Sequence, residues 1–185
     1  VDALPSAAAD AATRPLEIAL PSTPVPALAP VTQTGDAGLL IPVQGKAVKD
    51  LADTFTDARS EGRSHDAIDI MAPAGTPVLA VADGHVEKLF DSKRGGLTVY
   101  QFEPSGRYAY YYAHLQRYAD GLAEKQQITR GQVIGYVGST GNASPDGPHL
   151  HFAIFQLGPE RRWWEGMALN PYPLLVGKDT VQPAE

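Results

Sequence analysis

Short apolar runs separated by turn residues fill most of the chain after residue 38. Apolar and polar residues alternate in several of these runs, which is the pattern of a strand that buries one face. Two of the runs flank the dipeptide Asp83-Gly84, which is typical of a tight hairpin turn. Helical periodicity is almost absent. The pattern therefore predicts a mainly β, antiparallel fold with strands in the runs 40–45, 66–70, 76–82, 85–90, 97–102, 108–115, 128–137 and 149–155.

A different composition marks the first 38 residues, which are rich in alanine and proline and poor in charge. Repeated prolines interrupt helices and sheets and favour an extended tether. We therefore divide the chain into a linker or pro-segment at 1–38, one β-sheet domain at 39–178 and a tail at 179–185. A length of 185 residues suits a single domain with its own core. If the first segment covers a functional groove as a pro-segment, its deletion should raise activity.

Charge and cysteine content exclude several classes of function. The formal net charge is −6 and the isoelectric point is near 5.3, so the chain lacks the basic face that nucleic acids and anionic membranes require. Cysteine is absent, which excludes disulfides, iron–sulfur clusters and thiol nucleophiles, and any metal site must use histidine and carboxylate. No apolar run is long enough to span a membrane. We expect an extracytoplasmic monomer, periplasmic or secreted, whose signal or anchor is absent from this sequence.

The candidate metal ligands begin with a histidine pair, His149 and His151, in a strand-like apolar run. Side chains alternate in a strand, so both imidazoles share one face, and neutral imidazole is a common zinc ligand. The run 66–70 is expected to be extended. If the strand includes His65, then His65 and Asp69, which are four residues apart, project from the same face. Together with one of His149 and His151, they complete a three-ligand zinc site that keeps an open position for water.

The remaining histidines are candidates for the chemistry. The sequence has no H-E-x-x-H helix, so the glutamate base of that metalloprotease class is missing. His114, and whichever of His149 and His151 is not a ligand, can act as a base or stabilise an oxyanion. Asp146 is the reserve ligand if Asp69 does not bind the metal.

Four separated motifs agree in order and spacing with one known family, from about residue 41 to residue 155. The chain resembles the LytM/lysostaphin-type zinc metallopeptidases of peptidoglycan, the M23 peptidases, and four motifs together are far more specific than a single His-x-His pair. The motifs are His65-Asp66-Ala67-Ile68-Asp69 with Ala72-Pro73-Ala74-Gly75-Thr76-Pro77, then Tyr112-Ala113-His114-Leu115, residues 131–141, and Gly147-Pro148-His149-Leu150-His151-Phe152.

The resemblance implies a compact antiparallel β-sheet domain of the duplicated-hybrid-motif type, with the site in a groove between sheet and loops. It implies one Zn²⁺ held by His65, Asp69 and His151, with His114 and His149 serving the reaction. The implied activity is that of a zinc-dependent endopeptidase that cleaves peptidoglycan stems or cross-links in cell-wall remodelling or lysis. We expect His149 to deprotonate water, and His114 to stabilise the oxyanion or protonate the leaving amine.

Departures from the family pattern fall beside these residues. Ala67 replaces the usual glycine, Ala153 stands where a glutamate often follows, and the loop 142–146 differs, which bears on substrate specificity. None of these changes removes a ligand or a catalytic group. The complete set favours an enzyme over the alternative, a non-catalytic module of the same fold that binds cell wall or activates a separate hydrolase.

Three further features have structural explanations. His85 follows the Asp-Gly turn and is expected at the surface, outside the site. Tyr112 has the parity of His114 along the run 108–115, and it is expected either to pack or to contact substrate through its hydroxyl. The segment 161–164, with both tryptophans of the chain, is expected to cover one end of the sheet rather than to bind sugar.

Overall fold

The computed structural model describes residues 39–58 and 62–176, all of which belong to a compact unit assigned to Val31–Glu185. The segments predicted at 1–38 and 179–185 lie outside the described residues, so their boundaries with the domain stay predictions. Within the described ranges, no helix has the length and apolar character needed to cross a membrane.

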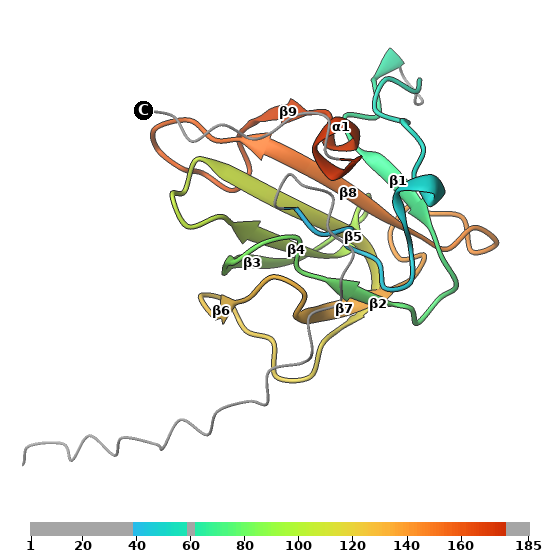
Figure 1. Ribbon diagram of the computed structural model, residues 1–185, viewed down its shortest axis with the longest axis horizontal. Coiled ribbons are helices and arrows are strands. Elements are labelled where there is room, and N and C mark those ends of the chain that lie inside the picture. The colour runs from blue at the N-terminus through green and yellow to red at the C-terminus, as the bar shows by residue number, and fades with distance from the viewer. Residues whose placement is uncertain (1–38, 59–61, 177–185) are drawn as a thin grey trace, which may run out of the picture. The chain divides into compact units, whose positions relative to one another are not determined.

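The described residues form one antiparallel sheet of nine strands with very little helix, which confirms the predicted mainly β class. Its main order is β1-β8-β5-β4-β3-β6, and β2 joins through β7, which pairs with β5 (Figure 1). The elements are a 3₁₀ turn (Val48–Asp50), β1 (Ile68–Met71), β2 (Pro77–Leu79), β3 (Gly84–Ser92), β4 (Gly96–Phe102), β5 (Tyr108–Tyr118), β6 (Gln127–Ile128), β7 (Val133–Val137), β8 (His149–Gln156), β9 (Met167–Leu169) and α1 (Pro171–Val176).

Strand β8 shows how the alternation of side chains builds the core. Leu150, Phe152 and Ile154 are fully buried, whereas the two histidines between and before them are only half-buried. The pairing of β1 with β8 sets Asp69 opposite His151 and Ile68 opposite Phe152. Directly opposed residues of an antiparallel pair project from the same face. One face of the sheet therefore carries the core, and the other carries the carboxylate and the histidines.

Strand β5 changes partner at His114. Before this residue β5 pairs with β8, ending at Ala113 opposite His151, and after it β5 pairs with β7, beginning at Leu115. On its other edge β5 pairs with β4, where Tyr112 lies opposite Val99 and Leu115 lies opposite Leu97. The segment of β5 between these pairs is therefore one residue longer than the matching segment of β4. The extra residue makes a β-bulge, and His114 has a left-handed φ of 61°. The bulge lies where β5 stops pairing with β8 and starts pairing with β7.

Two local expectations were wrong. The run 40–45 contributes a single bridge, between Val43 and Val78, instead of a strand. The run 66–70 is not extended throughout, because the strand starts at Ile68 and Asp66 adopts a left-handed φ of 54°. His65 therefore comes from a loop instead of sharing a strand face with Asp69. The run 128–137 does hold short strands, as expected: it is divided between β6 and β7, with a turn in which Gly131 has a φ of 85°. Glycine tolerates this conformation without a steric penalty.

The tryptophan segment partly covers the sheet, as expected. The Trp163 ring lies 5.4 Å from Phe90 of β3 and 4.9 Å from Tyr100 of β4, measured between ring centroids. Trp164 packs against Trp163 but keeps 61% of its surface exposed. Trp163 therefore provides most of the cover over the sheet.

Candidate metal centre and surrounding cleft

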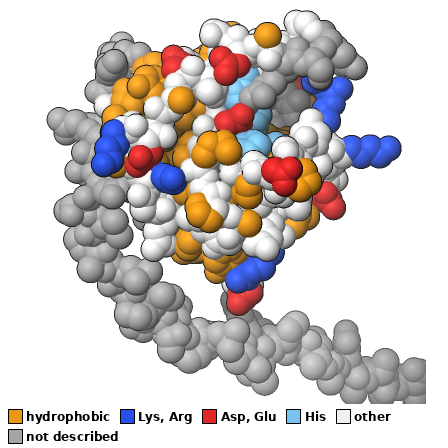
Figure 2. Space-filling view, turned by 90° about the vertical axis from the view of Figure 1, so that its right-hand side faces the viewer, with side chains coloured by type: hydrophobic (Ala, Val, Ile, Leu, Met, Phe, Trp, Pro, Cys, Tyr) orange, Lys and Arg blue, Asp and Glu red, His pale blue; other side chains and the backbone are white. Residues whose placement is uncertain are grey.

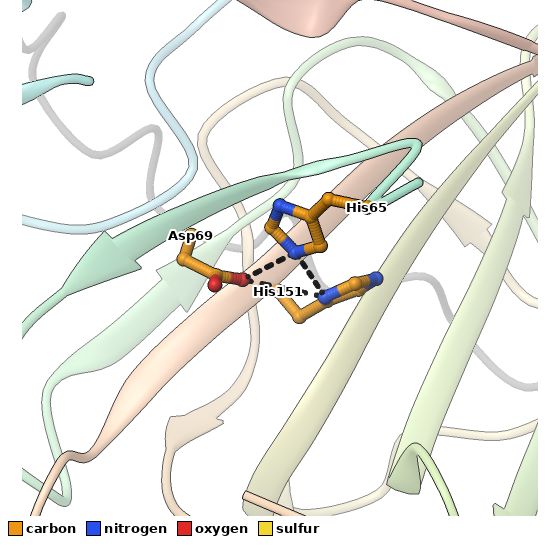
Figure 3. A group of neighbouring side chains, drawn as sticks. All are labelled: His65, Asp69 and His151. Atoms are coloured by element: carbon orange, nitrogen blue, oxygen red, sulfur yellow. Dashed lines mark hydrogen bonds and ion pairs between the residues drawn. The ribbon is translucent and has the colours of Figure 1, made fainter. Parts of the chain in front are cut away.

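Three of the predicted ligands converge on one point. The Nε2 atom of His65 lies 2.9 Å from Oδ1 of Asp69, and Nδ1 of His151 lies 3.3 Å from the same oxygen (Figure 3). The two imidazole nitrogens are 3.1 Å apart. All candidate ligand atoms of the three residues lie within 4.8 Å of one another. This arrangement of two imidazoles and a carboxylate matches the ligand types of a zinc site.

The sheet register and one threonine position these ligands. Asp69 and His151 face each other across the β1–β8 pair. Thr54 holds two of the ligand residues. Its carbonyl accepts a 2.8 Å hydrogen bond from Nδ1 of His65, and its hydroxyl accepts a 3.1 Å hydrogen bond from the Asp69 amide. The His65 amide is also held, by the Asp57 carbonyl at 2.9 Å. Thr54 was missed from the sequence, because it carries no motif and acts only through the fold.

The two predicted catalytic histidines lie beside this cluster. The His114 ring is 5.0 Å from the His149 ring and 5.6 Å from the His151 ring, between centroids. Nε2 of His149 lies 3.5 Å from Oδ1 of Asp69. The structure thus gathers all five predicted site residues. The reserve candidate Asp146 is absent from the described ligand cluster.

In three of the site imidazoles, a backbone carbonyl determines which nitrogen carries the proton. Nδ1 of His114 lies 2.7 Å from the Thr140 carbonyl, and Nδ1 of His149 lies 2.8 Å from the Gly147 carbonyl. A carbonyl can only accept, so Nδ1 donates in each case, as it does in His65. Each neutral ring then keeps an unprotonated Nε2. Such a nitrogen can bind a metal or accept a proton.

Electrostatics favour the protonation states that a metal centre needs. Burial by itself raises the pKa of Asp69, but its close interactions with the His151 and His65 imidazoles outweigh burial and hold the pKa well below the usual range. Burial lowers the pKa of His151, and it lowers the pKa of His114 to about 4. The carboxylate is therefore ionised, while these two imidazoles favour the neutral form.

An open cleft of about 670 Å³ surrounds the cluster. Figure 2 shows histidine side chains at the surface of this face, in a hollow among other side chains. Besides the five site residues, the lining of the cleft includes Tyr111, Arg94 and the loop residues 142–144. Of these, sequence reasoning had singled out only the loop.

Tyrosines 111 and 112 have opposite roles. Tyr112 is fully buried, its hydroxyl donates a 2.6 Å hydrogen bond to Gln101, and it accepts a 3.0 Å bond from the Val81 amide. It packs in the core, which resolves the two interpretations open for it. Tyr111 lines the cleft with its ring 5.8 Å from His151. The pairing of β5 with β8 could have identified it, because Tyr111 lies two residues before the partner of His151.

His85 lies apart from the site. It is on β3, where Nε2 lies 2.8 Å from a Glu87 carboxylate oxygen and the ring contacts Phe102. It does not line the cleft. The expected position outside the site is therefore correct, although the residue is partly covered rather than free in solvent.

Comparisons with known proteins point to one family. The model of peptidase family M23 matches residues 63–171, which include all five site residues. The L-Ala–D-Glu endopeptidase of Bacillus subtilis is 35% identical over 129 residues, which are 66% of this chain and 38% of that protein. The chain thus spans well under half the length of this relative.

Solved structures share the fold. The catalytic domain of lysostaphin from Staphylococcus simulans has a TM-score of 0.57 and 27% identity, covering 68% of this chain and 90% of that domain. A zinc-containing peptidase from Vibrio cholerae has a TM-score of 0.52 and 26% identity, covering 63% of this chain and 36% of the other. The similarity extends to the predicted LytM/lysostaphin-like antiparallel architecture.

Proposed function

Because the chain belongs to peptidase family M23, we propose that it is a zinc-dependent endopeptidase that hydrolyses peptide bonds in peptidoglycan stems or cross-links. The observation that carries the proposal is the ligand cluster of His65, Asp69 and His151, with two further histidines in the same cleft. A relative named for cleavage of the L-Ala–D-Glu bond supports the substrate class.

The proposed zinc ligands are His65 Nε2, an Asp69 carboxylate oxygen and His151 Nδ1. Two neutral imidazoles and one ionised carboxylate fit a single Zn²⁺ and leave a position for substrate or water. The hydrogen bond from His65 to Thr54 supports this assignment, since it directs the unprotonated Nε2 toward the cluster. When bound, zinc supplies Lewis acidity toward a carbonyl oxygen and makes water more acidic.

His149 and His114 are proposed to move protons. In the neutral tautomer set by the Gly147 carbonyl, the free nitrogen of His149 is Nε2, which lies beside Asp69 and can take a proton from the attacking water. His114 is held by Thr140 with its other nitrogen free, and after protonation it can donate to the oxyanion or to the leaving amine. Each ring is fixed by a backbone carbonyl, which limits rotation during the reaction.

Location and partners follow from the substrate. Peptidoglycan lies outside the cytoplasmic membrane, so a chain that cleaves it acts in the periplasm or outside the cell. We propose that this chain does so as a monomer that engages peptidoglycan peptides and does not bind nucleic acid, in keeping with its net charge of −6.

The alternative is a non-catalytic module that binds cell wall or activates a hydrolase. Such a module has no need for a metal ligand set together with two oriented imidazoles. The retention of all five side chains in one cleft therefore favours the enzyme.

Zinc content and fragment release test the proposal together. The purified chain should contain about one zinc per molecule by elemental analysis, and it should release soluble peptides from isolated peptidoglycan. Mass spectrometry of the fragments would identify the bond. A zinc-loaded chain that releases no fragment from stem-linked or bridge-linked peptidoglycan would sink the enzyme, and a chain without zinc would support the binding module.

A further inference from the structure

Arg94 places a guanidinium at the cleft, and the proposed reaction does not use it. It lies in the turn between β3 and β4, is exposed, and lines the same cleft as the five site residues. Within the described part of the chain, the hydrogen bonds of Arg94 involve only its backbone, and its guanidinium has no ion pair. Its side chain is therefore available to a ligand in the cleft.

The Arg94 backbone is tied to the elements that build the site. Its carbonyl accepts a 2.9 Å hydrogen bond from the Asn142 amide, and the next carbonyl, of Gly95, accepts a 2.7 Å bond from the His114 amide. A Cβ added at Gly141 would lie 2.3 Å from the Arg94 carbonyl oxygen. This close approach fixes the backbone of the arginine beside His114, while the residue as a whole is exposed.

Arg94 brings a positive charge to the cleft. Among the described residues that line it, the carboxylate is Asp69. That carboxylate is within 3.5 Å of three imidazoles and is committed to the metal cluster. An exposed arginine in the cleft of a chain with a net charge of −6 is suited to an anionic group on the substrate.

We propose that Arg94 is a specificity-determining residue that binds a free carboxylate of the substrate peptide. The planar guanidinium can make two parallel hydrogen bonds to a carboxylate. Stem peptides carry such groups, at D-glutamate and at their C-terminus, whereas bridges made of glycine carry none along their length. Resting on the proposed peptidase function, this inference assigns the substrate to carboxylate-bearing stem peptides.

Matched peptides and matched variants test the inference. Synthetic stem peptides would be compared with versions amidated at the D-glutamate carboxylate, at the C-terminus, or at both. The zinc-loaded wild-type chain should cleave the free peptide with kcat/KM about 10-fold higher, mainly through KM, as expected for losing roughly 1.4 kcal/mol of one charged hydrogen-bonded contact. The single amidation that removes this advantage identifies which carboxylate is bound.

Variants locate the effect at Arg94. Arg94→Ala should lose the preference for the free carboxylate, and Arg94→Lys should retain part of it, because lysine keeps the charge but not the paired geometry. Lys93→Ala is the control, since Lys93 is an exposed cation of the same turn that does not line the cleft. Equal cleavage of free and amidated peptides by wild type, or equal losses in the Arg94 and Lys93 alanine variants, would overturn the inference.

A binding measurement separates this inference from the proposed function. Calorimetry with the zinc-loaded His114→Ala chain, alone and combined with Arg94→Ala, reports carboxylate-dependent affinity without turnover. If wild type cleaves nothing but Arg94 still confers binding to the free peptide, the enzyme fails and the inference survives. If cleavage proceeds without regard to the carboxylate, the inference fails and the enzyme stands.

Discussion

His149 and His151 are two residues apart on the same face of β8, yet their surroundings differ. Nδ1 of His151 faces Asp69 and His65, at 3.3 and 3.1 Å. Nδ1 of His149 is instead used by the Gly147 carbonyl, which leaves Nε2 as the nitrogen nearest the cluster, 3.5 Å from Asp69. The alternation of side chains along β8 makes the two histidines look equivalent, but the orientations of their rings give them different contacts.

This inequality predicts different losses on substitution. His151→Ala should lose stoichiometric zinc, because it removes one of three ligands. His149→Ala should retain zinc and lower kcat by on the order of 10²- to 10⁴-fold, the usual contribution of a general base. Elemental analysis and a peptide-release assay measure the two effects. His85→Ala is the control and should leave both unchanged; zinc loss in the His149 variant would contradict the assigned roles.

Tyr112 supplies a stability prediction at the same scale. Tyr112→Phe removes a buried hydroxyl that donates to Gln101 and accepts from the Val81 amide. Leaving these partners unsatisfied should lower the free energy of unfolding by about 1–3 kcal/mol, measured by denaturant titration. Zinc content and cleavage should be preserved. Loss of cleavage at unchanged stability would instead show that the hydroxyl acts on substrate.

At the scale of elements, the alternation of side chains predicts the sheet but not the bulge in β5. A regular strand would place His114 on the face of Tyr112, in the core. The left-handed φ at His114 and the change of partner from β8 to β7 bring the imidazole to the cleft instead. Nothing in the local sequence distinguishes this bulge, because it is set by the meeting of three strands distant in sequence.

The sequence identified the five candidate residues that the structure gathers in one cleft, but it did not identify the residues that support them. The motifs identified His65 and Asp69, but the strand expected to align them begins only at Ile68. Thr54 orients both residues from outside any motif. Arg94 enters the cleft through a turn packed against a distant loop. Chemistry-bearing residue types are visible in a sequence, whereas residues that act through tertiary contacts need the fold.

The packing of that turn predicts an asymmetry between two glycines. Gly141→Ala and Gly121→Ala both place alanine at a left-handed φ, of 74° and 76°, at a similar strain of about 1–2 kcal/mol. At Gly141 the new Cβ would also lie 2.3 Å from the Arg94 carbonyl oxygen, whereas at Gly121 nothing lies within 4 Å.

Gly141→Ala should therefore unfold at lower denaturant than Gly121→Ala and should also lose cleavage activity, because the turn beside His114 must shift. Unfolding midpoints and kcat/KM compare the two variants directly. Equal stability and equal activity would mean that the contact between the turn and the loop relaxes freely and does not position the site.

At the scale of the whole molecule, the candidate metal centre joins distant parts of the chain. His65 and His151 are 86 residues apart in sequence, and the segment carrying His65 reaches the cluster from a loop outside the sheet. Hydrogen bonds to Thr54 and Asp57 attach this loop locally. A metal bound by His65, Asp69 and His151 would add a link between the loop, β1 and β8.

Metal removal should consequently lower thermal stability. Binding to the folded state alone contributes RT ln(1 + [L]/Kd), about 2.7 kcal/mol at 100 times Kd, which for a chain of this size corresponds to roughly 5–10 °C in Tm. Calorimetry should show this loss after chelation. Added Zn²⁺ should restore it, while Mg²⁺, which prefers six oxygen ligands, should not. His65→Ala should abolish the change in Tm on chelation and on adding Zn²⁺, since without that ligand the metal no longer ties the loop to the sheet. A wild-type Tm that does not change on chelation or on adding Zn²⁺ would refute the link between the loop, β1 and β8.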